Sequence, residues 1–112
     1  MMSFSAVALT RVKRLAPELE VVLLMKGQYT YQMAVSLLGP GWIAGPGIEL
    51  LRENPKLGQR LRKRGRRVHT WVVNEMEDLD LCVSLGAEAV ITDDPRRALD
   101  HLDGPSSLDL EN

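Results

Sequence analysis

Residues 65–74, GRRVHTWVVN, decide the fold of this chain. Gly65 follows a basic helical stretch and suits the left-handed position just beyond a helix end. Val68 to Val73 is a short apolar run, which is typical of a buried strand. Asn74 then stands before an acidic turn, where it can cap a new helix. This stretch therefore predicts a helix end, a buried strand and a helix start in immediate succession.

The same pattern recurs along the chain. Further buried strands are predicted at 21–25, 42–44 and 89–92, with amphipathic helical stretches between them. Asn54-Pro55 is expected to begin a helix, and Gly86, like Gly65, is expected to lie just beyond a helix end. The last helix begins at Asp93 or Asp94, with Asp93 favoured as a cap. Alternating strands and helices imply parallel strands, in an open sheet or a barrel. Since a TIM barrel has eight strands in about 250 residues, four strands in 112 residues are close to half of one.

Composition limits the possible partners. The chain has 112 residues, enough for one domain, and a formal net charge of −1, so no bulk attraction to nucleic acid or anionic membranes is expected. Cys82 is the single cysteine, which excludes an internal disulfide, and it is expected to pack as a small hydrophobic residue. No apolar stretch approaches 18 residues and no secretory pattern opens the chain, so a cytoplasmic location without an integral membrane segment is expected.

Three segments, in this order, resemble motifs of the glycerophosphodiester phosphodiesterase family. Ser3-Phe4-Ser5 is similar to the family's serine-phenylalanine strand end, and residues 65–74 resemble its glycine-led strand ending in Trp-Thr-Val-Asn, with Val72 in place of the threonine. Residues 85–95 resemble the final strand and depart from it at 87–89. The resemblance implies an α/β fold, the C-terminal half of a TIM (β/α)8 barrel with about four parallel βα units. We expect the partial barrel to span 1–102 and a flexible tail to follow at 103–112.

The resemblance also implies a function. Family members hydrolyse glycerophosphodiesters to glycerol 3-phosphate and an alcohol, with a divalent cation (Ca²⁺ or Mg²⁺) and two histidines that belong to motifs absent from this sequence. We therefore expect no catalytic residue, no metal ligand and no cofactor bound by this chain alone. The resemblance makes Phe4 and Trp71 the substrate-contact positions, lining the apolar side of the cleft in a complete barrel.

Other ionisable residues favour structural roles. His69 lies toward the amino end of its strand, the stability face of a barrel, and is expected to be buried; His101 lies in the last helix, facing solvent. Acidic residues 75–80 are explained by the start of a helix. The basic cluster, Arg60 to Arg67, surrounds a helix end at the amino face of a barrel, where cations offset the helix dipole. A partner-binding patch is the alternative for this cluster.

Two functional hypotheses remain open. The first is a phosphodiesterase fragment that is inactive alone and meets its glycerophosphodiester substrate only in a complete barrel. The second is a non-catalytic half-barrel that binds or self-associates through exposed sheet edges, with a second copy or a separate N-terminal half. A nucleotide-binding domain is disfavoured because residues 39–47 contain no GxGxxG or GxxxxGK[ST] pattern.

Overall fold

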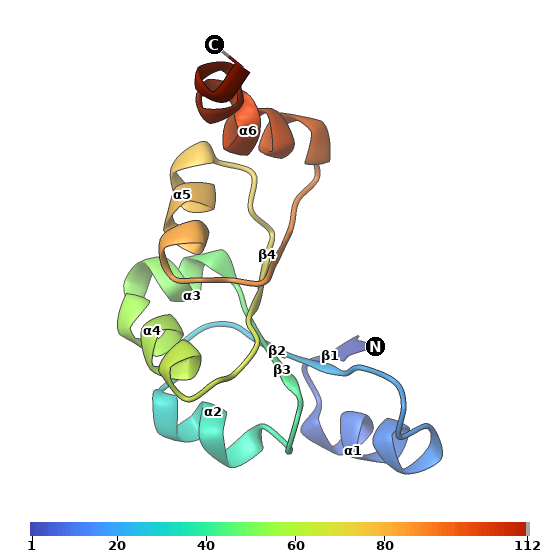
Figure 1. Cartoon of the computed structure of the whole chain (residues 1–112). Coiled ribbons are helices and arrows are strands. Elements are labelled where there is room, and N and C mark those ends of the chain that lie inside the picture. The colour runs from blue at the N-terminus through green and yellow to red at the C-terminus, as the bar shows by residue number, and fades with distance from the viewer. Residues whose placement is uncertain (112) are drawn as a thin grey trace.

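The computed structural model describes residues 1–111, with side chains described through Asp103. Strands and helices alternate along the chain, except that two helices follow each other between β3 and β4 (Figure 1). The strands are β1 (Met2–Ser3), β2 (Val22–Met25), β3 (Ile43–Pro46), β4 (His69–Trp71) and β5 (Ala89–Ile91). The helices are α1 (Ala6–Leu15), α2 (Tyr31–Leu37), α3 (Ile48–Glu53), α4 (Pro55–Lys63), α5 (Met76–Ser84) and α6 (Pro95–Glu111).

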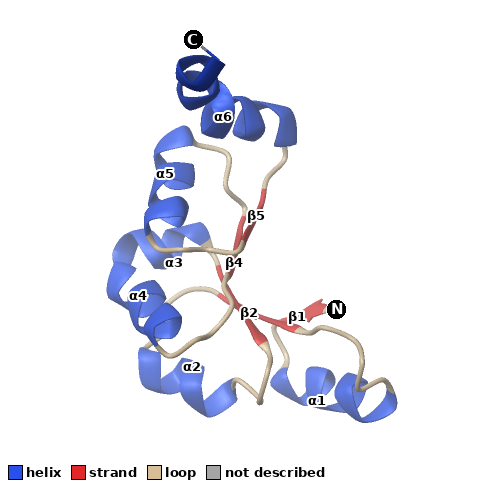
Figure 2. Ribbon diagram, in the orientation of Figure 1, coloured by secondary structure: helices blue, strands red, loops and turns tan. Residues whose placement is uncertain are grey.

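All strand pairings are parallel. One sheet has the order β1-β2-β3 and a second pairs β4 with β5. Two parallel bridges, Ala44 with Val68 and Gly47 with Trp71, join β3 to β4, so the strands follow chain order from β1 to β5. Figure 2 shows them at the centre, with the helices in an arc around them. This arrangement confirms the predicted alternation of parallel strands and helices.

Strand β3 extends beyond its predicted end at residue 44 and includes Gly45-Pro46. A Cβ at Gly45 would lie 2.6 Å from Val22 Cγ1 and 3.1 Å from the carbonyl oxygen of Leu23. The missing side chain therefore lets β2 and β3 approach each other. The predicted strand ended at residue 44 because the apolar run stops there, before Gly45-Pro46.

Two groups of buried side chains form the core. The larger one lies under α1, α2 and α4 and includes Leu9, Leu23, Met25 and Leu57. The smaller one lies beneath α5 and includes Leu79 and Cys82, which is fully buried as expected. Burial raises the pKa of the Cys82 thiol, because the thiolate is disfavoured away from water. The core thus packs the helices against the strands.

Several helix boundaries agree with the sequence and others differ. Pro55 is at the start of α4, and Gly65 and Gly86 have φ of 77° and 75°, as predicted for residues just beyond helix ends. Helix α3 was not predicted. The backbone of α6 continues through 103–111, where irregular structure was expected. The domain boundary at 102 and the flexibility of the tail stay predictions, and Asn112 lies outside the described residues.

Candidate functional site

A pocket of about 310 Å³ lies at the carboxyl ends of β2, β3 and β4. The carboxyl ends of the strands are the catalytic face of a (β/α)8 barrel. Trp71 is the last residue of β4, and Lys26 follows β2 directly. The lining residues are Lys26, Gly27, Gly47, Ile48, Glu49, Leu50, Trp71 and Val72.

Phe4 and Trp71, the two substrate-contact positions expected from the sequence, lie against each other. Their ring centroids are 5.6 Å apart and their planes meet at 79°, an edge-to-face contact. The Trp71 indole Nε1–H donates to the Gly45 carbonyl oxygen at 2.6 Å, which fixes the ring across the end of β3. Phe4 remains 51% exposed.

Lys26 adds a positive charge beside these rings. Its Nζ lies 5.0 Å from the centre of the Phe4 ring, within the range of a cation–π interaction. Glu49, in the first turn of α3, lines the same pocket. The sequence analysis did not single out Lys26. A cation directly after a buried strand was the signal that could have identified it.

Asn74 and Asp93 join the carboxyl ends of β4 and β5. Asn74 Nδ2 donates to Asp93 Oδ2 at 2.9 Å, while Asn74 Oδ1 accepts from the Asp93 backbone N–H at 3.0 Å. The predicted cap at Asn74 is therefore wrong, and at the last helix the favoured Asp93 is wrong while the alternative, Asp94, is confirmed. Glu75 is the N-cap residue of α5 without a side-chain hydrogen bond, and Asp94 accepts from the Arg97 N–H at 3.1 Å at the start of α6. Asn74 and Asp93 thus bind each other across the strands instead of capping their own helices.

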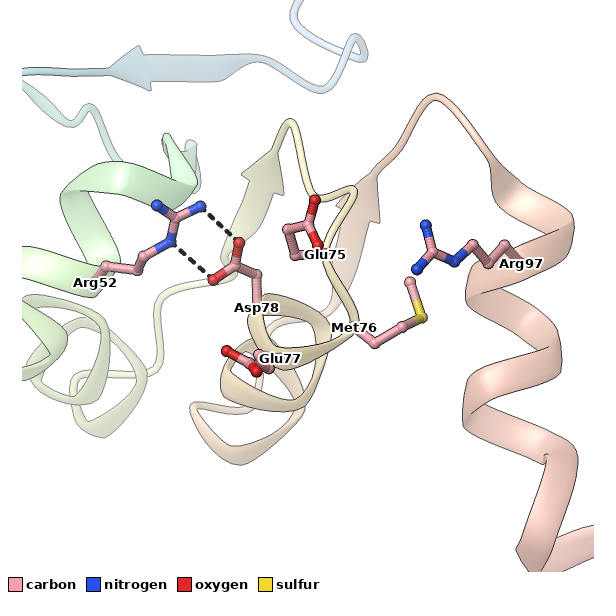
Figure 3. A pocket seen from close by; sticks show the side chains of 6 residues that line it. All are labelled: Arg52, Glu75, Met76, Glu77, Asp78 and Arg97. Atoms are coloured by element: carbon pink, nitrogen blue, oxygen red, sulfur yellow. Dashed lines mark hydrogen bonds and ion pairs between the residues drawn. The ribbon is translucent and has the colours of Figure 1, made fainter.

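The acidic residues 75–80 do more than begin a helix. Asp78 is buried and accepts two hydrogen bonds from Arg52, at 2.8 Å and 2.6 Å (Figure 3). These residues are 26 positions apart, and no local pattern predicts their pairing. The pair ties α3 to the first turn of α5 and borders an open hollow that Arg97 also lines.

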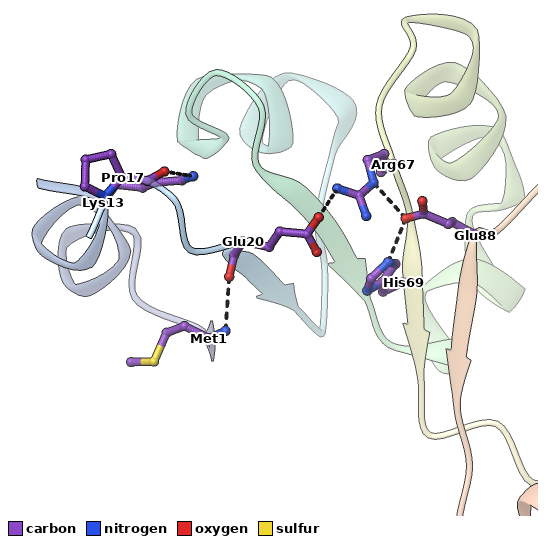
Figure 4. Close-up of polar contacts among 7 residues, drawn as sticks. All are labelled: Met1, Lys13, Pro17, Glu20, Arg67, His69 and Glu88. Atoms are coloured by element: carbon purple, nitrogen blue, oxygen red, sulfur yellow. Dashed lines mark hydrogen bonds and ion pairs between the residues drawn. The ribbon is translucent and has the colours of Figure 1, made fainter. Parts of the chain in front are cut away.

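His69 lies at the amino end of β4, as expected, but is only partly buried. Its Nε2 is 2.8 Å from Glu88 Oε2, and Arg67 bridges Glu88 to Glu20 (Figure 4). The hydrogen bond from Arg67 holds the pKa of both Glu88 and Glu20 below the usual value. This network joins the amino ends of β2, β4 and β5, on the face opposite the pocket that Trp71 lines.

His101 is likewise held by a carboxylate. Its Nε2 lies 2.8 Å from Asp80 Oδ1, and the side chain is 34% exposed, in the last helix as expected. Among the side chains described through residue 103, no three His, Cys, Asp or Glu groups converge as metal ligands. In the described chain no helix is long and apolar enough to cross a membrane.

Comparisons with known proteins agree with this geometry. Residues 1–97 match the Glycerophosphoryl diester phosphodiesterase family. A Mycobacterium tuberculosis protein named "Probable glycerophosphodiester phosphodiesterase 1" is 40% identical over 97 residues, which cover 86% of this chain and 35% of that protein. The chain therefore spans about a third of the length of this curated relative.

Solved structures show the same architecture. A Parabacteroides distasonis glycerophosphodiester phosphodiesterase superposes with a TM-score of 0.74 at 21% identity, over 94% of this chain and 43% of that one. An Oleispira antarctica phosphodiesterase, solved with the product sn-glycerol-3-phosphate, superposes with a TM-score of 0.70 at 18% identity, over 92% and 41%. These matches confirm the predicted fold, a partial TIM barrel.

Proposed function

The chain belongs to the glycerophosphoryl diester phosphodiesterase family, and we propose that it supplies one wall of the substrate cleft in a barrel that cleaves glycerophosphodiesters. The observation that carries this proposal is the edge-to-face contact of Phe4 with Trp71 at the carboxyl ends of the strands. Aromatic rings at this position exclude water and present an apolar surface to the carbon skeleton of a glycerol or alcohol group. The substrate class follows from the family.

The described residues do not supply the rest of the reaction. Phosphodiester cleavage needs charge neutralised on the phosphoryl oxygens and an acid to protonate the leaving alkoxide. Lys26 offers one cation beside the aromatic wall, while the two described histidines are held by Glu88 and Asp80. We propose that the other barrel half supplies the divalent cation, Ca²⁺ or Mg²⁺, and the acid–base groups. The chain by itself is then inactive. The cytoplasmic location expected from the sequence stays a prediction.

An activity assay with and without an N-terminal barrel half tests this proposal. We expect the chain alone to release no glycerol 3-phosphate from glycerophosphocholine in the presence of Ca²⁺ or Mg²⁺. Adding the N-terminal half of the Mycobacterium tuberculosis relative is expected to produce turnover, because the two halves together complete the site. Glycerol 3-phosphate release is measured, and the N-terminal half alone is the control. Turnover by the unaccompanied chain would contradict the proposal.

A second candidate function is that of a non-catalytic module that self-associates. The observation that favours it is the position of β1 and β5 at the two ends of the strand order, with Met2 41% and Ile91 37% exposed. Unpaired strand edges with apolar side chains are ready to pair with another chain.

Light scattering, which measures the mass of the particles in solution, tests this second candidate function. If β1 and β5 pair between copies, the chain is expected to form a dimer or a larger species at micromolar concentration. Placing a lysine at Ile91, on edge strand β5, is expected to shift it toward the monomer, because a charge there opposes edge pairing. A lysine at exposed Val83 of α5 is the control. A monomeric parent chain would rule out self-association.

A further inference from the structure

Two adjoining hollows lie at the amino ends of the strands, on the face opposite the pocket that Trp71 lines. One, of about 400 Å³, lies between the ends of α1 and α2, and the other, of about 440 Å³, lies beside the segment that joins α4 to β4. Both are lined by Pro40 and Trp42, so they meet at the turn before β3. We call the two hollows together the basic groove.

The charged side chains that line the basic groove all have the same sign. Lys13 and Arg14 come from the last turn of α1, and Arg64, Arg66 and Arg67 from the end of α4 and the segment after it. Neither hollow has an Asp or Glu among its lining residues. A concave surface with one sign of charge concentrates the electric field and attracts counter-ions, even on a chain with a net charge of −1.

Most of this charge is not neutralised within the described chain. Arg67 is paired with Glu20 and Glu88. Arg66 Nη1 donates to the Gly39 carbonyl oxygen at 3.0 Å, and Lys13 Nζ donates to the Pro17 carbonyl oxygen at 3.0 Å, but a carbonyl oxygen leaves the charge in place. None of the ion pairs among the described side chains includes Arg14 or Arg64, both of which are exposed.

Compensation of helix dipoles does not account for this arrangement. It explains why Lys13 and Arg14 lie in the last turn of α1 and why basic residues end α4. It does not explain why two helices far apart in sequence direct cations to two adjoining hollows that have no carboxylate among their lining residues. Like charges that gather in this way repel each other until an anion binds between them.

We propose that the basic groove binds a phosphate-bearing anion. Planar guanidinium groups, such as those of Arg14, Arg64 and Arg66, match the oxygens of a phosphate group in bidentate fashion. The Trp42 indole forms the wall where the two hollows meet. The phosphate belongs either to a small soluble molecule or to a lipid headgroup. Leu37, which is 41% exposed and lines the same groove, offers an apolar contact for the second source.

Binding measurements on the whole 112-residue chain test the proposal. Isothermal titration calorimetry with inorganic pyrophosphate measures binding of a soluble phosphate compound. Co-sedimentation with phosphatidylcholine vesicles, with and without phosphatidic acid, measures binding to a phosphate headgroup of a lipid. The double variant Arg14→Gln/Arg64→Gln is expected to weaken binding at least tenfold, for whichever of the two ligands, pyrophosphate or phosphatidic acid vesicles, the parent chain binds. Perturbation of the Trp42 indole N–H resonance on addition of pyrophosphate is expected to locate a soluble ligand in the groove.

Arg11→Gln is the matched control, because Arg11 is an exposed arginine of α1 that does not line the groove. It is expected to leave binding within twofold of the parent value. Circular dichroism checks that each variant keeps its fold. Pyrophosphate binding identifies a soluble ligand, and binding only to phosphatidic acid vesicles identifies a lipid headgroup. Absence of binding to both ligands overturns the proposal, and so does an equal loss in the control and the double variant.

Discussion

Replacing Trp71 with alanine is expected to lower the free energy of unfolding by about 3 kcal/mol, the low end for truncating a large aromatic side chain, because the ring is partly exposed. The change removes the ring from its contact with Phe4 and leaves the Gly45 carbonyl oxygen without its indole donor. Urea unfolding, followed by circular dichroism, measures the loss.

The variant Trp71→Phe separates the two contributions of this residue. It keeps an aromatic ring beside Phe4 but removes the hydrogen bond to Gly45, so we expect a loss of about 1 kcal/mol. In the barrel reconstituted with an N-terminal half, the alanine variant is expected to lower kcat/KM more than the phenylalanine variant, since only the former loses the apolar wall. Equal stability of Trp71→Ala and the parent chain would show that the indole does not fix the strand ends.

Replacing Asp78 with alanine is expected to lower the free energy of unfolding by about 2 kcal/mol. Two charge-assisted hydrogen bonds from Arg52 end on this buried carboxylate, and hydrogen bonds to charged groups contribute about 1.5–3 kcal/mol. The loss stays moderate because the Arg52 side chain is 50% exposed and water can solvate it in the variant. Thermal unfolding is expected to show a fall in Tm of roughly 10 °C for a chain of this size.

Asp80→Ala is the matched control for Asp78, because it removes a carboxylate from the same helix. The Asp80 side chain is 66% exposed and contacts His101 at the surface, so its loss is expected to change the free energy of unfolding by no more than about 0.5 kcal/mol. Equal effects of the two substitutions would show that the pair with Arg52 does not stabilise the junction between α3 and α5.

The site could be predicted from the sequence only in part. Phe4 and Trp71 were assigned through their motifs, and the structure places their rings in contact, although substrate binding by them stays a prediction. Lys26 lay outside any recognised motif, and its position beside Phe4 depends on how β1 and β2 pair. Asn74 and Asp93 were each assigned to a local cap, because a sequence shows neighbours along the chain and not across strands.

The sequence by itself determined the alternation of strands and helices, the parallel fold and the helix ends at Gly65 and Gly86. These features depend on local chemistry: apolar runs that must be buried and backbone conformations that favour glycine. Only the tertiary structure decided that Asp78 pairs with Arg52 and that cations from α1 and α4 meet around Trp42. Such contacts join residues far apart in the chain, and their partners are set by how the elements pack.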